Sequence, residues 1–407
     1  MLPAPDSHAL IALLVIGALV ALWRVARGRH LATRIVAGAL ALALAFVSGL
    51  VAVNAHFGYY RTWSALGTDL TGGPAAESVA LPTATSPSAV RAATFAQPVA
   101  GRSRLLTMRL AGPRSGITRQ AYVWLPPQYD EPAFAATRFP VLELLHGYPG
   151  RPSDWLTALR LTTVLGDEIA AHRIGPMVVV LPTISPADWP GSQECTNEVG
   201  SAQDATYVGD DVPQVIAQSF RVEPPGPSWG IGGFSTGGYC AAMLALRAPS
   251  TFGAVIDLDG YLHPAEGGFL PRRFRGDVAA EAGYDIPALI AQDAHGPLPA
   301  FDVVSGSGVR ADERDAVGLT DLLRARESVP LLIERGAGHT FYAWGDALPS
   351  VLDWAWRTIA PLSLQRAIPT VDPAVAGRAD VRVDVSPLDR LSTVLDEALS
   401  ARRRHRS

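Results

Sequence analysis

The pentapeptide Gly233-Phe234-Ser235-Thr236-Gly237 has the spacing G-x-S-x-G, which is typical of a serine nucleophile exposed at a sharp turn. An apolar run precedes it at 228–234, and a segment rich in Ala, Met and Leu follows it at 238–247. This order predicts a strand, a tight turn and a helix. Ser235 is therefore the candidate nucleophile, and an ordinary Gly-rich turn is the alternative interpretation.

A serine hydroxyl becomes a good nucleophile when an imidazole removes its proton and a carboxylate orients that imidazole. After a G-x-S-x-G elbow these partners follow in the chain order acid, then histidine. His339 lies in a small-residue loop, 336–340, directly after the strand-like run 330–334. The sequence therefore predicts that His339 is the general base at the end of the last strand.

The acid is expected in the loop that follows another strand-like run, 301–305. This loop is rich in small residues and ends in carboxylates, of which Asp312 is the expected triad acid. Glu313 and Asp315 are the rivals. Each of the three would also suit the start of a helix expected at 314–327, where negative charge complements the helix dipole.

Negative charge that develops on a substrate oxygen needs backbone N–H donors. One donor is expected from Thr236, the residue after the nucleophile, and a second from the loop 145–150 after an earlier apolar run. In that loop Tyr148 or Gly147 is the expected donor, and a plain strand-ending turn is the alternative. His146 precedes the glycine, and we expect it to shape this loop rather than to catalyse.

The region 104–360 resembles the putative-esterase family, which includes esterase D and the mycobacterial mycolyltransferases. The motifs that carry the resemblance are, in chain order, the segment VWLPPQYD at 123–130, Leu144-Leu145-His146-Gly147, Asp154-Trp155, Asp188-Trp189, 207–220, 232–238 and Gly338-His339.

This resemblance implies an α/β-hydrolase fold, a mostly parallel sheet flanked by helices. It implies a triad of Ser235, Asp312 and His339. The mycolyltransferases place an aspartate before the first oxyanion-loop glycine, and His146 stands there in this chain. That difference weakens the case for a trehalose substrate.

Two continuous apolar runs, 9–23 and 35–53, precede this region, and the second is long enough to span a bilayer. We predict a hairpin of two transmembrane helices. A cleaved signal peptide is the alternative for the first run, but no basic residue precedes it. Arginines crowd the connection, which places it in the cytoplasm and the catalytic domain outside: Arg24, Arg27, Arg29 and Arg34.

The predicted domain organisation is a membrane anchor at 1–58, an extracytoplasmic linker at 59–103, the hydrolase domain at 104–360 and a C-terminal extension at 361–407. The linker is rich in Gly, Pro, Ser, Thr and Ala, as expected of an exposed tether. Aromatic residues at its start are expected at the lipid interface or packed on the hydrolase domain: Tyr59, Tyr60 and Trp63. The extension is expected to form a helix, with leucines on one face, that packs on the main domain.

The chain has two cysteines, Cys195 in a polar loop and Cys240 on the helix after the nucleophile. An oxidising compartment would allow them to form a disulfide that holds this loop beside the active site. Two free buried thiols are the alternative, because the sequence does not give the distance between the two α-carbons.

Several signals of other functions are missing from the sequence. It has no C-x-x-C, no H-E-x-x-H and no clustered histidines, so no metal site is expected, and no G-x-G-x-x-G marks a nucleotide cofactor. A net charge of −4 argues against nucleic acid as a partner.

The expected function is a membrane-tethered, extracytoplasmic serine esterase or acyltransferase that forms an acyl-enzyme. Its expected substrate is an ester or acyl lipid, with water or a sugar hydroxyl as the acceptor. The alternative is a catalytically silent hydrolase-fold scaffold that binds envelope lipid or a protein partner.

Overall fold

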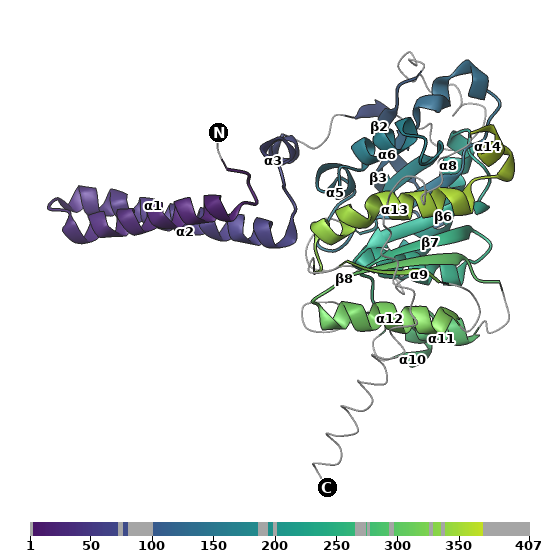
Figure 1. Cartoon of the computed structure of the whole chain (residues 1–407). Coiled ribbons are helices and arrows are strands. Elements are labelled where there is room, and N and C mark those ends of the chain that lie inside the picture. Colours follow the sequence, from purple (N-terminus) through teal and green to yellow (C-terminus); the bar gives the residue numbers. More distant parts are fainter. Residues whose placement is uncertain are drawn as a thin grey trace, which may run out of the picture.

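The computed structural model describes residues 3–71, 76–79, 101–185, 194–197, 202–264, 274, 277–292, 297–324, 329–334 and 338–368. Figure 1 shows two parts, an N-terminal helical hairpin and a layered domain to which the hairpin is joined at one end. Asp188-Trp189 and the helix expected in the C-terminal extension lie outside the described residues.

The described residues of the layered domain form a nine-stranded sheet with the order β1-β2-β3-β5-β4-β6-β7-β8-β9. From β5 to β9 every neighbouring pair is parallel, whereas β3 is antiparallel to both β2 and β5. The central strands are apolar on both faces, as in β4 and β5, because helices cover both sides of a parallel sheet. The bounds are β1 Glu77–Val79, β2 Arg104–Ala111, β3 Thr118–Leu125, β4 Val141–Leu145, β5 Val178–Pro182, β6 Gly226–Phe234, β7 Phe252–Leu258, β8 Ala300–Gly306 and β9 Leu331–Glu334.

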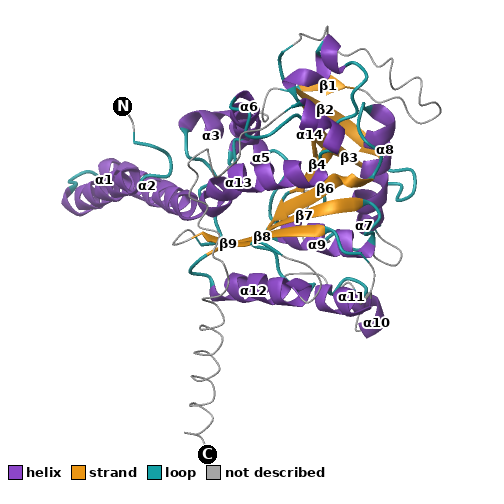
Figure 2. Ribbon diagram, turned by 45° about the vertical axis from the view of Figure 1, so that its right-hand side comes forward, coloured by secondary structure: helices purple, strands orange, loops and turns teal. Residues whose placement is uncertain are grey.

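Helices cover both faces of this sheet, which Figure 2 shows in orange. One apolar core lies under α8, α9 and α12, and a second lies under α5, α6 and α13. The bounds are α5 Asp154–Thr157, α6 Leu161–Ala170, α7 Asp204–Thr206, α8 Val212–Ser219, α9 Thr236–Arg247, α10 Val278–Ala282, α11 Ile286–Gln292, α12 Arg310–Arg324, α13 Phe341–Ile359 and α14 Leu362–Ala367. The mostly parallel sheet with helices on both sides is the architecture that the sequence predicts.

The N-terminal hairpin consists of α1 (His8–Arg27) and α2 (Leu31–Phe57), which contain the two predicted apolar runs. Small side chains are buried between them and let the helices approach closely: Ala18, Ala21, Ala37, Ala41 and Ser48. Within the described part of the chain, these two helices are long and apolar enough to cross a membrane. Few residues of either helix are buried, unlike those of a core helix.

The start of the segment expected to be an exposed tether contains regular structure. Helix α3 (Trp63–Leu70) begins after Thr62, whose Oγ1 accepts a hydrogen bond from the Ala65 N–H. Strand β1 pairs in parallel with β2 at the edge of the sheet. Asp69 accepts hydrogen bonds from Tyr60 and from Arg151 of the layered domain. These described parts of the segment are therefore packed on the domain.

Candidate active site

Ser235 lies at the turn between β6 and α9, in the strand-turn-helix context that the sequence predicts. Its backbone has φ 56° and ψ −124°, a left-handed conformation that costs free energy for a residue with a side chain. An added Cβ at Gly233 would overlap the backbone of Gly237, and one at Gly237 would overlap the Leu145 carbonyl oxygen. Both glycines are thus required by close backbone approach. The turn places Ser235, which is half-buried, at the carboxyl edge of the sheet.

His339 and Asp312 meet at the same edge of the sheet. His339 follows β9, and Asp312 lies in the first turn of α12, which begins at Arg310, four residues before the predicted start. The His339 Nδ1 donates a hydrogen bond of 2.8 Å to the Asp312 Oδ2. The rival Glu313 instead accepts a hydrogen bond of 2.7 Å from the Gly308 N–H. The geometry thus favours Asp312 as the partner of the imidazole.

A second carboxylate, Asp259, which the sequence reasoning missed, lies beside this pair. It follows β7 directly, and the Asp259 Oδ1 accepts a hydrogen bond of 2.8 Å from the Gly306 N–H. The Asp259 Oδ2 accepts one of 2.7 Å from the Trp344 indole N–H. Side-chain atoms of Asp259, Asp312 and His339 lie within 4.8 Å of one another. The available signal was an acid-glycine pair at the end of a buried strand, which is a common position for a site residue.

Such a group of donor atoms can hold a metal ion. Here protein N–H groups bond to both Asp259 oxygens and to one Asp312 oxygen. Hydrogen bonding therefore explains why these side chains converge.

The two carboxylates set the protonation of His339. Burial lowers the pKa of His339, but the hydrogen bond to Asp312 and the negative charges of Asp259 and Asp312 outweigh it, so the pKa is raised above its usual value. Burial raises the pKa of Asp259, partly opposed by its hydrogen bond from Trp344 and the charge of His339. This arrangement stabilises an imidazolium, the species that forms when a histidine takes a serine proton.

Aromatic packing joins the histidine loop to the nucleophile turn. The Phe234 ring stacks on Trp344 with 4.8 Å between ring centroids, and Trp344 contacts His339 edge to face at 5.0 Å. An added Cβ at Gly147 would lie 3.0 Å from the Phe234 ring. The oxyanion loop, the elbow and the histidine therefore pack around one aromatic pair, which fixes their relative positions.

His146 is buried and shapes the loop after β4. Its Nδ1 lies 2.8 Å from the Gly147 carbonyl oxygen, and its Nε2 accepts a hydrogen bond of 3.2 Å from the Ile184 N–H. These contacts require a neutral ring with the proton on Nδ1. Burial lowers the pKa of His146 to about 4, in agreement with that state. The loop that precedes Tyr148 is therefore held by a structural histidine.

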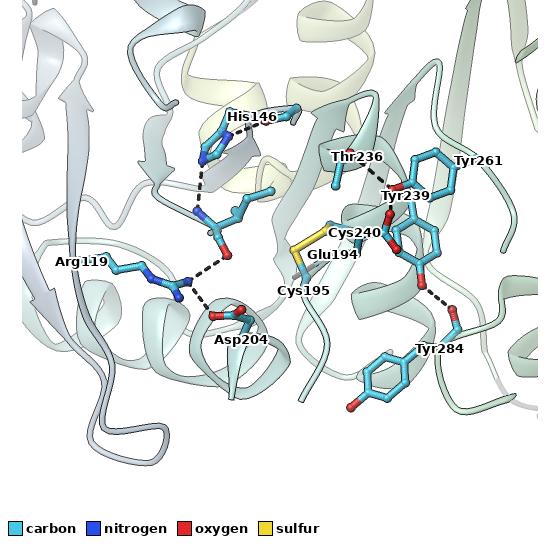
Figure 3. The surroundings of a disulfide bond; sticks show 12 residues. Arg119, His146, Glu194, Cys195, Asp204, Thr236, Tyr239, Cys240, Tyr261 and Tyr284 are labelled. Atoms are coloured by element: carbon cyan, nitrogen blue, oxygen red, sulfur yellow. Dashed lines mark hydrogen bonds and ion pairs between the residues drawn. A yellow bond between two sulfur atoms is a disulfide. The ribbon is translucent and has the colours of Figure 1, made fainter. Parts of the chain in front are cut away.

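Cys195 and Cys240 form a disulfide with 5.7 Å between their α-carbons, which confirms the predicted bond. The bond holds Glu194 beside α9, where the Tyr261 hydroxyl donates a hydrogen bond of 2.6 Å to the Glu194 carboxylate (Figure 3). The same hydroxyl lies 3.4 Å from the Thr236 Oγ1. The disulfide therefore supports the wall of the site next to the expected oxyanion donor.

Solved structures with the same fold include a ferulic acid esterase, an S-formylglutathione hydrolase from Agrobacterium tumefaciens and FphF, a fluorophosphonate-binding serine hydrolase from Staphylococcus aureus. The ferulic acid esterase is 21% identical, covers 64% of this chain and 100% of its own, and has a TM-score of 0.54. The S-formylglutathione hydrolase is 17% identical, covers 65% of this chain and 99% of its own, and has a TM-score of 0.54. FphF is 18% identical, covers 63% of this chain and 99% of its own, and has a TM-score of 0.51. At these identities the likeness concerns the fold, and it confirms the α/β-hydrolase architecture.

A curated relative is an uncharacterized protein of Corynebacterium glutamicum, 29% identical over 246 residues. The match covers 58% of this chain and 56% of the relative, so the chain spans little more than half of that protein's length. A family model described as "Putative esterase" matches residues 113–355, more than half of the chain. The protein therefore belongs to this esterase family of α/β-hydrolases.

Proposed function

We propose that the protein is a serine ester hydrolase or acyltransferase that works through an acyl-enzyme on Ser235. The observation that carries the proposal is the left-handed turn at Ser235 together with the hydrogen bond of 2.8 Å between His339 and Asp312. Family membership supports an esterase-type reaction.

In the proposed first half-reaction, the His339 Nε2 takes the Ser235 hydroxyl proton while the Oγ attacks the ester carbonyl carbon. Asp312 holds the Nδ1–H, so the other ring nitrogen is the base. The carbonyl oxygen becomes an oxyanion that accepts hydrogen bonds from the N–H of Thr236 and of Tyr148 or Gly147. The carbon–oxygen bond to the alcohol then breaks, and the imidazolium protonates the departing oxygen.

In the second half-reaction an acceptor hydroxyl gives its proton to His339 while its oxygen attacks the acyl carbon. The bond between that carbon and the Ser235 Oγ then breaks, and the imidazolium returns the proton to the Oγ. Water as acceptor gives hydrolysis, and a sugar or lipid hydroxyl gives acyl transfer. The two outcomes differ in which acceptor the site admits and how well it excludes water. A transfer product in excess of hydrolysis with a sugar acceptor would identify a transferase.

The proposal includes two membrane spans with the catalytic domain outside the cytoplasm. The arginines of the α1–α2 connection favour a cytoplasmic position for that end of the hairpin. The disulfide supports an oxidising compartment for the other end, since such bonds are rare in the cytosol. Fusing a reporter enzyme to either end of the hairpin would test this orientation.

The first experiment is labelling of the detergent-solubilised full chain with a fluorophosphonate, with the adduct located by peptide mass spectrometry. We expect an adduct on Ser235 that is lost in Ser235→Ala and strongly slowed in His339→Ala. His263→Ala, which removes an exposed imidazole, is the matched control and should label as the wild type does. Folded protein that forms no adduct would overturn the enzyme proposal in favour of the silent scaffold.

A further inference from the structure

The hairpin is fixed to the catalytic domain at the segment that follows His339. The Arg61 side chain donates a hydrogen bond of 2.7 Å to the Phe341 carbonyl oxygen and lies over the Tyr342 ring at 4.4 Å. The Tyr342 hydroxyl donates a hydrogen bond of 2.7 Å to the carboxylate of Asp6, which lies just before α1. Tyr59 packs on Phe341 at 4.7 Å. These contacts dock the hairpin beside the segment that follows His339. Figure 1 shows that the end of the hairpin facing the domain is the one opposite the α1–α2 connection.

A pocket of about 900 Å³ lies between this end of the hairpin and the active-site loops. Its hairpin wall includes Ile11 of α1 with Ala52 and Phe57 of α2, and its domain wall includes Val309 and His339. The volume is in the range that holds a small-molecule ligand. The hairpin, which is expected to anchor the protein in the membrane, therefore forms one wall of the pocket at His339.

The chemistry of His339 indicates which part of a substrate belongs there. A triad histidine protonates the departing alcohol and deprotonates the incoming one, so the alcohol side of the ester faces the imidazole. His339 lines the pocket, whereas neither Ser235 nor Thr236 is among its lining residues. A pocket that His339 lines without Ser235 or Thr236 suits the alcohol part of an ester better than its acyl part.

The hairpin indicates where such an alcohol comes from. The same two helices expose large apolar side chains beyond the pocket, among them Leu13, Ile16 and Leu50. In a bilayer these side chains contact lipid tails, so an apolar chain can pass from the lipid along the hairpin into the pocket without crossing water. The hydroxyl end of such a molecule would then meet His339, and the hairpin wall of the pocket also includes His8 and His56.

We infer that this pocket binds the alcohol part of a membrane lipid, as the leaving group of the ester or as the acceptor of the acyl group. The inference rests on the proposed function. It assigns the hairpin a role in substrate recognition in addition to its expected role as an anchor, with Ala52 and Ile11 as specificity-determining positions.

Two isomeric esters test the inference on the full chain in detergent micelles. Decyl acetate and ethyl decanoate have the same atoms and similar partitioning into micelles, but carry the long chain on the alcohol side and the acyl side, respectively. We expect kcat/KM for decyl acetate to exceed that for ethyl decanoate at least tenfold, measured by titration of the released acid. A preference for ethyl decanoate, or equal rates, would overturn the inference.

A pocket-filling variant gives a second measurement. Ala52→Trp should lower the preference for decyl acetate at least tenfold, because the indole occupies the chain's place. Val53→Trp is the matched control, since Val53 is 54% exposed and does not line the pocket; it should keep the wild-type preference. A preference that survives Ala52→Trp, or that falls equally in both variants, would contradict the assignment.

Fluorophosphonate labelling separates failure of this inference from failure of the proposed function. If Ser235 labels and ethyl acetate is cleaved as fast as decyl acetate, the serine enzyme stands and the pocket assignment is wrong. If Ser235 does not label and neither ester is cleaved, the enzyme proposal fails and takes the inference with it.

Discussion

Breaking the disulfide tests both the stability of the fold and the support of the active site. Cys195 and Cys240 are fully buried and 45 residues apart in sequence. In the chain-entropy model, a crosslink that closes a loop of this length stabilises the fold by about 4 kcal/mol at 25 °C. For a domain of this size, that loss corresponds to a fall in Tm of about 10 °C.

Reduction should also lower activity, because the freed loop carries Glu194. The hydrogen bond from Tyr261 to this carboxylate is 2.6 Å long, and bonds to charged groups contribute about 1.5–3 kcal/mol. If this bond holds the wall beside Thr236, its loss lowers kcat/KM roughly tenfold. Tyr261→Phe isolates the effect, since it removes the hydroxyl but keeps the ring stacked on Tyr239. We expect this variant to lose activity while it keeps its disulfide.

The assay is thermal unfolding of the full chain in detergent, followed by tryptophan fluorescence with and without a phosphine reductant. The wild type should lose about 10 °C on reduction. The double variant Cys195→Ala, Cys240→Ala should unfold near the reduced value and not respond to reductant. A wild-type Tm that moves by less than about 2 °C, with thiol alkylation confirming reduction, would refute the stabilising role.

Three further predictions concern individual side chains of the site. Asp312→Asn should lower kcat by a factor of about 10³–10⁴, whereas the kcat of Glu313→Gln should stay within a few-fold of the wild-type value. The opposite order in steady-state assays would make Glu313 the triad acid. The raised pKa of His339 means that activity should be lost as pH falls through a midpoint above the usual histidine value, because the imidazole then loses its base form. Asp259→Asn should shift this midpoint of the pH–rate profile to lower pH. An unshifted midpoint would show that Asp259 does not act on the imidazole. His146 has a pKa of about 4 in the fold, so the free energy of unfolding should fall by about 3 kcal/mol as pH drops from 6.5 to 4. His146→Gln should flatten this pH dependence in denaturant titrations. An equal pH dependence in both proteins would contradict the neutral buried ring.

Local patterns in the sequence were sufficient for the elements that carry the site. The run before Ser235 forms β6, the run before His339 forms β9, and the predicted order of strand, turn and helix is present at the elbow. These predictions succeed because an apolar run, a glycine pair and a helix-forming segment act on neighbouring residues, whose contacts are set by backbone geometry. The long apolar runs likewise correspond to α1 and α2.

Tertiary structure decided the contacts between distant segments. Asp312 and Glu313 are adjacent in sequence, and their side-chain directions in the first turn of α12 bring one to His339 and the other to Gly308. Asp259 reaches the same imidazole from another strand, and the pocket at His339 takes its other wall from the hairpin.

The disulfide also depended on tertiary structure, since the sequence left free thiols as an alternative and packing brought the α-carbons within bridging distance. Local periodicity does not show which side chains that are distant in sequence contact each other in the fold. The sequence by itself therefore determined the elements and the candidate nucleophile and base, and packing decided their neighbours, because those contacts form only when the whole sheet and its helices come together.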